Sequence, residues 1–212
     1  MPTMSAPHDD IITRTESLGH RWSQQPVFRG LQFALPAGVT LLQGEEQSGK
    51  TTLLRILSGD IQPSEGWVET QGLRADQAPE AYQRLVFRTE PHNEALDQIS
   101  ASAWFQELPA RYPRFDEVAL RGLIEGFALT PHLEKPHYML SAGSRRKVGL
   151  SAALASGAAL TLLDQPFAAL DAPSARLLKE VLQEMAIHPR RACVIADYEA
   201  PEGIELVATL SL

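Results

Sequence analysis

The stretch Gly44-Glu45-Glu46-Gln47-Ser48-Gly49-Lys50-Thr51 fits the pattern G-x-x-x-x-G-K-[ST] at every position. The glycines let the backbone bend so that successive N–H groups point inward at phosphate oxygens. In this pattern the lysine reaches the β- and γ-phosphates of a nucleotide, and the threonine hydroxyl binds Mg²⁺. We therefore expect the nucleotide to contact the loop and the residue after it: Gly44, Glu45, Glu46, Gln47, Ser48, Gly49, Lys50, Thr51 and Thr52.

The segments on both sides of this loop agree with the motif. Residues 39–42 are an apolar run, typical of a buried parallel strand, and residues 51–57 have a helical pattern. The positive end of that helix would face the same phosphates. The alternative is a glycine turn beside a helix start, with no ligand. Glu45 and Glu46 are unfavourable beside an anion, so we expect their side chains to point away.

Strand and helix patterns alternate along the rest of the chain. Strands are expected at residues 31–35, 66–69 (an edge strand), 85–87, 159–163 and 192–196, and helices at 101–107, 116–127 and 174–186. Pro109 and Pro113 separate the first two helices. This order predicts an α/β fold in one domain over residues 1–212, with a mostly parallel core sheet and helices on both faces. A helical subdomain at about residues 91–140 interrupts the core.

Composition excludes several classes of function and partner. The chain has 212 residues, and its net charge of -7 argues against nucleic acid as a partner. The single cysteine, Cys193, excludes an internal disulfide framework and a cysteine-based zinc cluster. Residues 1–10 lack the pattern of a secretory signal. The uncharged stretch 148–163 is too short to span a membrane and should break at residues 156–157. We therefore expect a cytoplasmic location.

A second motif supports the prediction of a bound Mg²⁺ ion. Residues 160–163 are apolar and end in Asp164, a pattern in which the carboxylate holds Mg²⁺ across from the loop hydroxyl, here that of Thr51. Apolar strands that end in aspartate are common. Asp164 becomes specific because it follows Lys50 by 114 residues and precedes Gln-Pro-Phe-Ala-Ala-Leu-Asp at 165–171.

About twenty residues before this strand stands Leu140-Ser141-Ala142-Gly143-Ser144. With it, the chain resembles the ATP-binding subunit of ABC transporters over nearly its whole length; the signature motif of that family is usually written LSGGQ. In the family this segment docks on the γ-phosphate held by the opposite subunit, which implies nucleotide contacts for Ser141 and Gly143. Ser141 also suits a helix N-cap, and a capping role alone is the alternative.

The resemblance implies an ABC-type P-loop NTPase fold with a small antiparallel β lobe, and ATP and Mg²⁺ as cofactors. It implies a homodimer or heterodimer with a similar ATPase subunit, and a separate transmembrane permease that places the chain at the inner face of the cell membrane. Trp22 falls where the family stacks an aromatic ring on adenine, although a rim residue packed on the sheet is nearly as good an interpretation. Residues 169–171 resemble the D-loop. The short chain and the LSAG spelling resemble haem-exporter ATPases, and residues 112–116 resemble ATPases of other small bacterial exporters.

Three positions depart from the family. Gln165 replaces the glutamate that polarises the attacking water, and losing a general base lowers a rate by about 10²–10⁴-fold. Asp197 replaces a histidine that contacts the γ-phosphate. A carboxylate about 4 Å from a phosphate charge is repelled by roughly 4 kcal/mol at an effective dielectric of 20. Asp197 therefore turns away, takes up a proton, binds Mg²⁺ or is a plain solvated loop residue. Thr89 stands near the position of the Q-loop glutamine.

Two functions follow. In the first, the chain binds Mg-ATP and couples ATP-driven dimerisation, with weak hydrolysis, to a separate permease. In the second, it is a non-hydrolysing partner that completes the site of a competent ATPase. A sharper hypothesis within the first makes Asp197 the base while Gln165 only positions the water. DNA-repair or translation ABC proteins need a coiled-coil insert or a second cassette, for which the chain has no room. The signature segment argues against a P-loop kinase.

Overall fold

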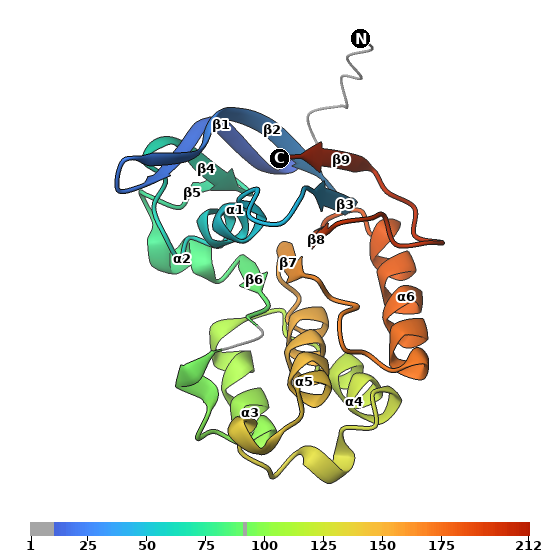
Figure 1. Cartoon of the computed structure of the whole chain (residues 1–212). Helices are drawn as coiled ribbons and strands as arrows, with labels where there is room; N and C mark the ends of the chain where they lie inside the picture. The colour runs from blue at the N-terminus through green and yellow to red at the C-terminus, as the bar shows by residue number, and fades with distance from the viewer. Residues whose placement is uncertain (1–10, 91–92) are drawn as a thin grey trace.

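The computed structural model describes residues 11–90 and 93–212, and its core is a five-stranded sheet (Figure 1). The strand order is β6-β7-β8-β3-β9, and every neighbouring pair is parallel. The strands are β3 (Gly38–Gln43), β6 (Val86–Arg88), β7 (Leu160–Asp164), β8 (Ala192–Asp197) and β9 (Ala208–Ser211). The predicted parallel core is confirmed. The sequence analysis did not predict β9, which is short and only partly buried.

A second, antiparallel sheet has the order β2-β1-β4-β5. Its strands are β1 (Ile11–Trp22), β2 (Gln25–Pro36), β4 (Glu65–Thr70) and β5 (Leu73–Arg74). The expected antiparallel β lobe is therefore confirmed. The prediction that residues 66–69 form an edge strand is wrong, because Gln71 and Gly72 adopt positive φ and turn the chain back, so that β5 pairs with the outer side of β4.

Helices cover both faces of the parallel sheet (Figure 1). They are α1 (Lys50–Leu57), α5 (Ala142–Ala155) and α6 (Ala172–Ala186). Successive side chains of a strand point to opposite faces. In β8, Cys193 and Ile195 pack with α5 and α6, whereas Val194 and Ala196 pack with α1. Each face therefore has its own hydrophobic cluster, as a parallel strand buried on both sides requires.

The segment between β6 and α5 is helical, as predicted. It contains α3 (Ala101–Arg111) and α4 (Glu117–Gly126), with short 3₁₀ turns at Glu94–Leu96, Thr130–His132 and His137–Met139. The expectation that Pro109 separates the helices is wrong, because α3 runs through Pro109 and ends two residues later. A proline near a helix end removes only one hydrogen bond of the last turn. Buried side chains of α3 and α4 join the cluster of α5 and α6. The subdomain bounds at 91–140 stay a prediction, and residues 91 and 92 lie outside the described residues.

The uncharged stretch breaks where predicted. The Ser156 hydroxyl donates to the carbonyl of Ala153 at 2.7 Å and accepts from the N–H of Ala158 at 3.1 Å. Gly157 has φ 65°, and a Cβ there would collide with the carbonyl of Arg114. Within residues 11–90 and 93–212, no helix is long and apolar enough to cross a membrane. The predicted absence of a secretory signal concerns residues 1–10, which lie outside the described part.

A short helix, α2 (Pro79–Gln83), precedes β6.

Candidate functional site

The phosphate loop joins the end of β3 to the start of α1, as its motif predicted. Gly49 has φ 102°, and a Cβ there would lie 2.5 Å from Cγ1 of Val27 on β2. Both the backbone conformation and the close approach of β2 therefore require glycine. No side chain caps the N-terminus of α1, which leaves its first N–H groups facing the loop. Uncapped N–H groups at a helix start favour an anion.

Lys50 is held by the loop itself. Its side chain is 7% exposed, and its ammonium group donates to the carbonyl of Gly44 and, at 2.9 Å, to that of Glu45. The ring of Tyr198 lies over the ammonium group, with its centroid 4.7 Å from Nζ. Glu45 and Glu46 are exposed, which fits the expectation that they point away from the loop. Two N–H groups of Lys50 are thus engaged, and an aromatic ring faces the same charge.

The two predicted metal ligands meet at this edge of the sheet. The Thr51 hydroxyl donates to Oδ2 of Asp164 at 2.9 Å. A hydroxyl and a carboxylate are the oxygen ligands that Mg²⁺ prefers, so the pair fits this ion. No group of three His, Cys, Asp or Glu side chains that could hold a metal occurs in the described part of the chain.

Gln165 and Asp197 lie at the same edge of the sheet. Asp197 ends β8, directly between the end of β3 and the end of β7, and its Oδ1 accepts from the N–H of Tyr198 at 2.8 Å. Gln165 has φ 44°, and its N–H donates to the carbonyl of Ala196 at 2.9 Å. A glutamine at positive φ is uncommon and indicates that its surroundings fix the backbone. The structure thus brings both atypical residues next to the phosphate loop and Asp164.

Arg146, which the sequence analysis did not select, fixes that backbone. Its guanidinium on α5 donates to the carbonyl of Asp164 at 3.1 Å and to the carbonyl of Gln165. Burial lowers the pKa of Arg146, while the charges of Asp164 and Asp197 oppose that shift. The available signal in the sequence was the basic run at 145–147 directly after the signature segment.

The signature segment is a helix start, as Ser141 indicated. Its hydroxyl accepts from the N–H of Ser144 at 3.1 Å and caps α5. A Cβ at Gly143 would lie 2.7 Å from the carbonyl of Ala169, so glycine lets the 165–171 loop pack on this segment. Among the described residues, no hydrogen bond or ion pair joins residues 140–147 to residues 44–51. The cap is therefore observed, and the segment is not bonded to the phosphate loop of its own chain.

The C-terminal end of the 165–171 loop, at Asp171, is fixed by an ion pair and a helix cap. Lys147 forms an ion pair with Asp171 at 2.5 Å, and Asp171 also accepts from the N–H of Ser174 at 2.9 Å as the N-cap of α6. The hydrogen bond from Lys147 holds the pKa of Asp171 well below its usual range. Consecutive residues Arg146 and Lys147 thus link α5 to both ends of the loop that follows Asp164.

Trp22 ends β1 and is 49% exposed, with His20 edge-to-face at 4.7 Å between ring centroids. The same β1–β2 hairpin carries Val27, whose side chain lies close to Gly49 of the phosphate loop. The Thr89 hydroxyl donates to the carbonyl of Leu162 at 3.3 Å and accepts from the N–H of Asp164 at 3.4 Å. Thr89 therefore supports β7. Residues 91 and 92, which follow Glu90, lie outside the described residues.

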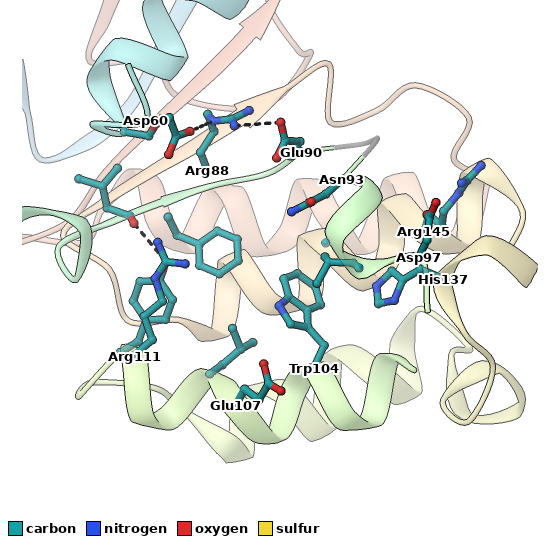
Figure 2. A pocket seen from close by; sticks show the side chains of 17 residues that line it. Asp60, Arg88, Glu90, Asn93, Asp97, Trp104, Glu107, Arg111, His137 and Arg145 are labelled. Carbon is teal, nitrogen blue, oxygen red and sulfur yellow. Dashed lines mark hydrogen bonds and ion pairs between the residues drawn. The ribbon is translucent and has the colours of Figure 1, made fainter. Parts of the chain in front are cut away.

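A cavity of about 370 Å³ opens between the end of β6 and α3 (Figure 2). Arg88 lies on its wall, bonded to Asp60 at 2.7 Å and to Glu90 at 3.2 Å. Two buried polar atoms on the wall have no partner, Nε of Arg145 and Nε2 of His137. The other ring nitrogen of His137, Nδ1, donates to the carbonyl of Ile99 at 2.6 Å, so Nε2 is an acceptor in the neutral imidazole. The cavity therefore offers one unmet donor and one unmet acceptor.

Comparison with known proteins agrees with this geometry. A family model described as ABC transporter matches residues 28–168. The chain is 33% identical over 181 residues to the cytochrome c biogenesis ATP-binding export protein CcmA of Nitrosococcus oceani, covering 82% of this chain and 80% of that protein. It is 28% identical over 204 residues to the taurine import ATP-binding protein TauB of Pseudomonas syringae pv. tomato, covering 95% and 78%.

Solved structures share the fold. One described as the ATP binding subunit of an ABC transporter superposes with a TM-score of 0.78 at 20% identity, covering 87% of this chain and 79% of the other. A putative ABC transporter ATP-binding protein from Pyrococcus furiosus gives a TM-score of 0.74 at 21% identity, covering 94% and 96%. At these identities the likeness concerns the fold alone.

The position of Tyr198 leads to a first prediction. Its ring faces the Lys50 ammonium, and we expect a phosphate that binds this ammonium to displace the ring. Such a contact contributes about 0.5–1 kcal/mol at an exposed site, and we expect Tyr198→Leu to bind ATP about 2- to 5-fold more tightly than wild type. Tyr198→Phe keeps the ring and should bind like wild type. Equilibrium titration with a fluorescent ATP analogue measures both variants. Weaker binding by Tyr198→Leu would mean that the ring holds Lys50 in place for the phosphates.

Proposed function

The chain belongs to the ABC transporter family and is an ATP-binding subunit of that family, and on this premise we propose that it binds Mg-ATP through Lys50, Thr51 and Asp164 and drives a separate permease. The observation that carries the proposal is the hydrogen bond between Thr51 and Asp164, at the point where the phosphate loop meets the end of β7. Mg²⁺ bound to these oxygens would neutralise charge on the β- and γ-phosphates.

The remaining roles fall to the chain's own groups. The loop N–H groups and the start of α1 cradle the phosphates, and Lys50 supplies a positive charge that is already positioned. Trp22 stacks on the base. Gln165 orients a water molecule through its side-chain amide but cannot take its proton. The proposed catalytic residues are Gln165 and Asp197, and hydrolysis is slow unless Asp197 acts as the base.

We propose further that ATP brings two subunits together, either two copies of this chain or this chain and a similar ATPase. The N–H groups at the start of α5 and the Ser141 hydroxyl favour an anion, yet they have no bond to the phosphate loop of their own chain. A γ-phosphate on a second subunit would supply that anion. Gly143 lets the 165–171 loop pack against this surface. Association of the two subunits would therefore affect the positions of Asp164 and Gln165.

The permease would bind at the 370 Å³ cavity beside α3, which would hold the chain peripherally at the inner face of the membrane. Glu90 on its wall adjoins Thr89, whose hydroxyl accepts from the backbone N–H of Asp164. Arg145, which also lines the cavity, follows the signature segment. A permease segment in this cavity would contact Glu90, next to the residue that supports Asp164, and Arg145, next to the signature segment. Nε of Arg145 and Nε2 of His137 have no hydrogen-bond partner. A permease segment with one acceptor, such as a carboxylate, and one donor would satisfy both atoms.

The hydrolysis proposal is tested by two single variants. If the base is absent, Gln165→Glu should raise the steady-state ATPase rate by about 10²-fold or more, and Asp197→Ala should change it little. If Asp197 has taken over as base, Asp197→Ala should remove most of the activity while ATP binding persists. Lys50→Ala is the control without nucleotide binding, and sedimentation in Mg-ATP records self-association in parallel.

The non-hydrolysing alternative gives a different pattern. Wild-type activity equal to that of Lys50→Ala, restored only when a second ATPase subunit is added, would favour it over an active subunit. A chain that stays monomeric in Mg-ATP, with or without the membrane partner, would contradict the shared site.

The docking proposal is tested at Gly149 on α5, which lines the cavity. A Cβ at this helix position meets no atom within 4 Å, so Gly149→Leu should fill the cavity without clash. We expect this variant to bind ATP like wild type but to lose at least ten-fold in co-purification with a co-expressed membrane subunit. Gly122→Leu, a helix glycine that also faces open space but outside this cavity, is the matched control. Equal loss in both variants would contradict a specific docking site here.

A further inference from the structure

We propose that a second groove, between α4 and α6, binds a small amphipathic anion, with an apolar body and one carboxylate or phosphate group. The groove encloses about 670 Å³, within the range typical of small-molecule sites. None of its lining residues belongs to the phosphate loop, to the signature segment or to the 164–165 pair. The inference therefore goes beyond ATP binding and stands without it.

The floor of the groove is apolar. Leu123 of α4, Leu154 of α5, and Leu177, Val181 and Met185 of α6 line it. Gly122 of α4 keeps it open, because a Cβ at this position would meet no atom within 4 Å. This surface suits a hydrocarbon or ring system that leaves water.

One end of the groove is cationic. Arg114, Arg190 and Arg191 line it together with His188. Arg191 is already bound to the carbonyls of Ala158 at 3.1 Å and Leu154 at 3.5 Å. The side chains of Arg114 and Arg190 have no hydrogen bond or ion pair with any described residue. Burial lowers the pKa of His188, and the charges of Arg191 and Arg190 lower it further.

Two carboxylates also line the groove and offset part of this positive charge. Asp116 is engaged as the N-cap of α4, where Oδ1 accepts from the N–H groups of Val118 and Ala119, both at 2.9 Å. Glu184 on α6 is the second. Three guanidinium groups thus face two carboxylates, and two of the guanidinium groups remain free. A guanidinium matches the paired oxygens of a carboxylate or phosphate, which defines the head group of the ligand.

An occupied groove would connect two parts of the molecule. α4 lies in the helical segment between β6 and α5, whereas α6 starts directly after the 165–171 loop (Figure 1). A ligand that contacts both helices would restrain the helical segment relative to the core. Binding of the ligand would thus also affect the 165–171 loop, which follows Asp164 and leads into α6.

The test uses the full chain with its methionine methyl groups labelled with ¹³C, titrated with decanoate and, separately, decyl phosphate in the absence of nucleotide. We expect at least one of the two to shift the Met185 resonance saturably, while exposed Met139, which lies outside the groove, does not move. The two probes distinguish carboxylate from phosphate as the head group. Decanol has the same apolar body without the charge and should bind at least ten-fold more weakly.

Variants decide whether the groove itself is the site. Gly122→Leu should fill the groove, and the double variant Arg114→Gln/Arg190→Gln should remove the free charges; each should weaken binding at least ten-fold. Arg121→Gln on α4, whose side chain pairs with Glu117 outside the groove, should bind like wild type. The proposal is overturned if neither anion shifts Met185, if decanol binds as well as the anions, or if both groove variants bind like wild type.

Discussion

The hydrogen bond from the Thr51 hydroxyl to the Asp164 carboxylate is the contact on which the rest of the site depends. It joins the first turn of α1 to the end of β7, two segments 113 residues apart in the sequence. For these atoms to meet, β3 and β7 must be parallel and must end at the same edge, with β8 between them. The same arrangement places Asp197 between the phosphate loop and Asp164 and leaves the helical segment attached beyond the far edge, at β6.

Much of this was predictable from local patterns. Apolar runs with a loop motif predicted β3, α1 and β7, and the end of β7 identified Asp164. A capping residue marked one helix start, since Ser141 is the N-cap of α5. Elements with irregular patterns were missed or misjudged. β1 has several register shifts that break its alternation, β9 is short, and α3 tolerates Pro109 in its last turn.

The parts of the site that could not be predicted depend on long-range placement. No local pattern indicates that the Tyr198 ring lies over Lys50, or that Arg146 reaches the carbonyls of Asp164 and Gln165. Thr89 was compared with the family glutamine, but its hydroxyl is used by the backbone of β7. Both cavities form between helices that are separate in sequence. Grooves of this kind follow from tertiary packing and leave only weak signals, such as glycines inside helices.

The central claim is that Thr51 and Asp164 hold the metal of a bound Mg-ATP. The most direct measurement is the ATP dissociation constant of wild type, Thr51→Val and Asp164→Asn, each with excess Mg²⁺ and with a chelator. If these two residues hold the metal, Mg²⁺ should tighten ATP binding by wild type about ten-fold or more, which corresponds to about 1.4 kcal/mol, and each variant should lose most of this gain. An equal gain from Mg²⁺ in wild type and both variants would show that Thr51 and Asp164 do not hold the metal.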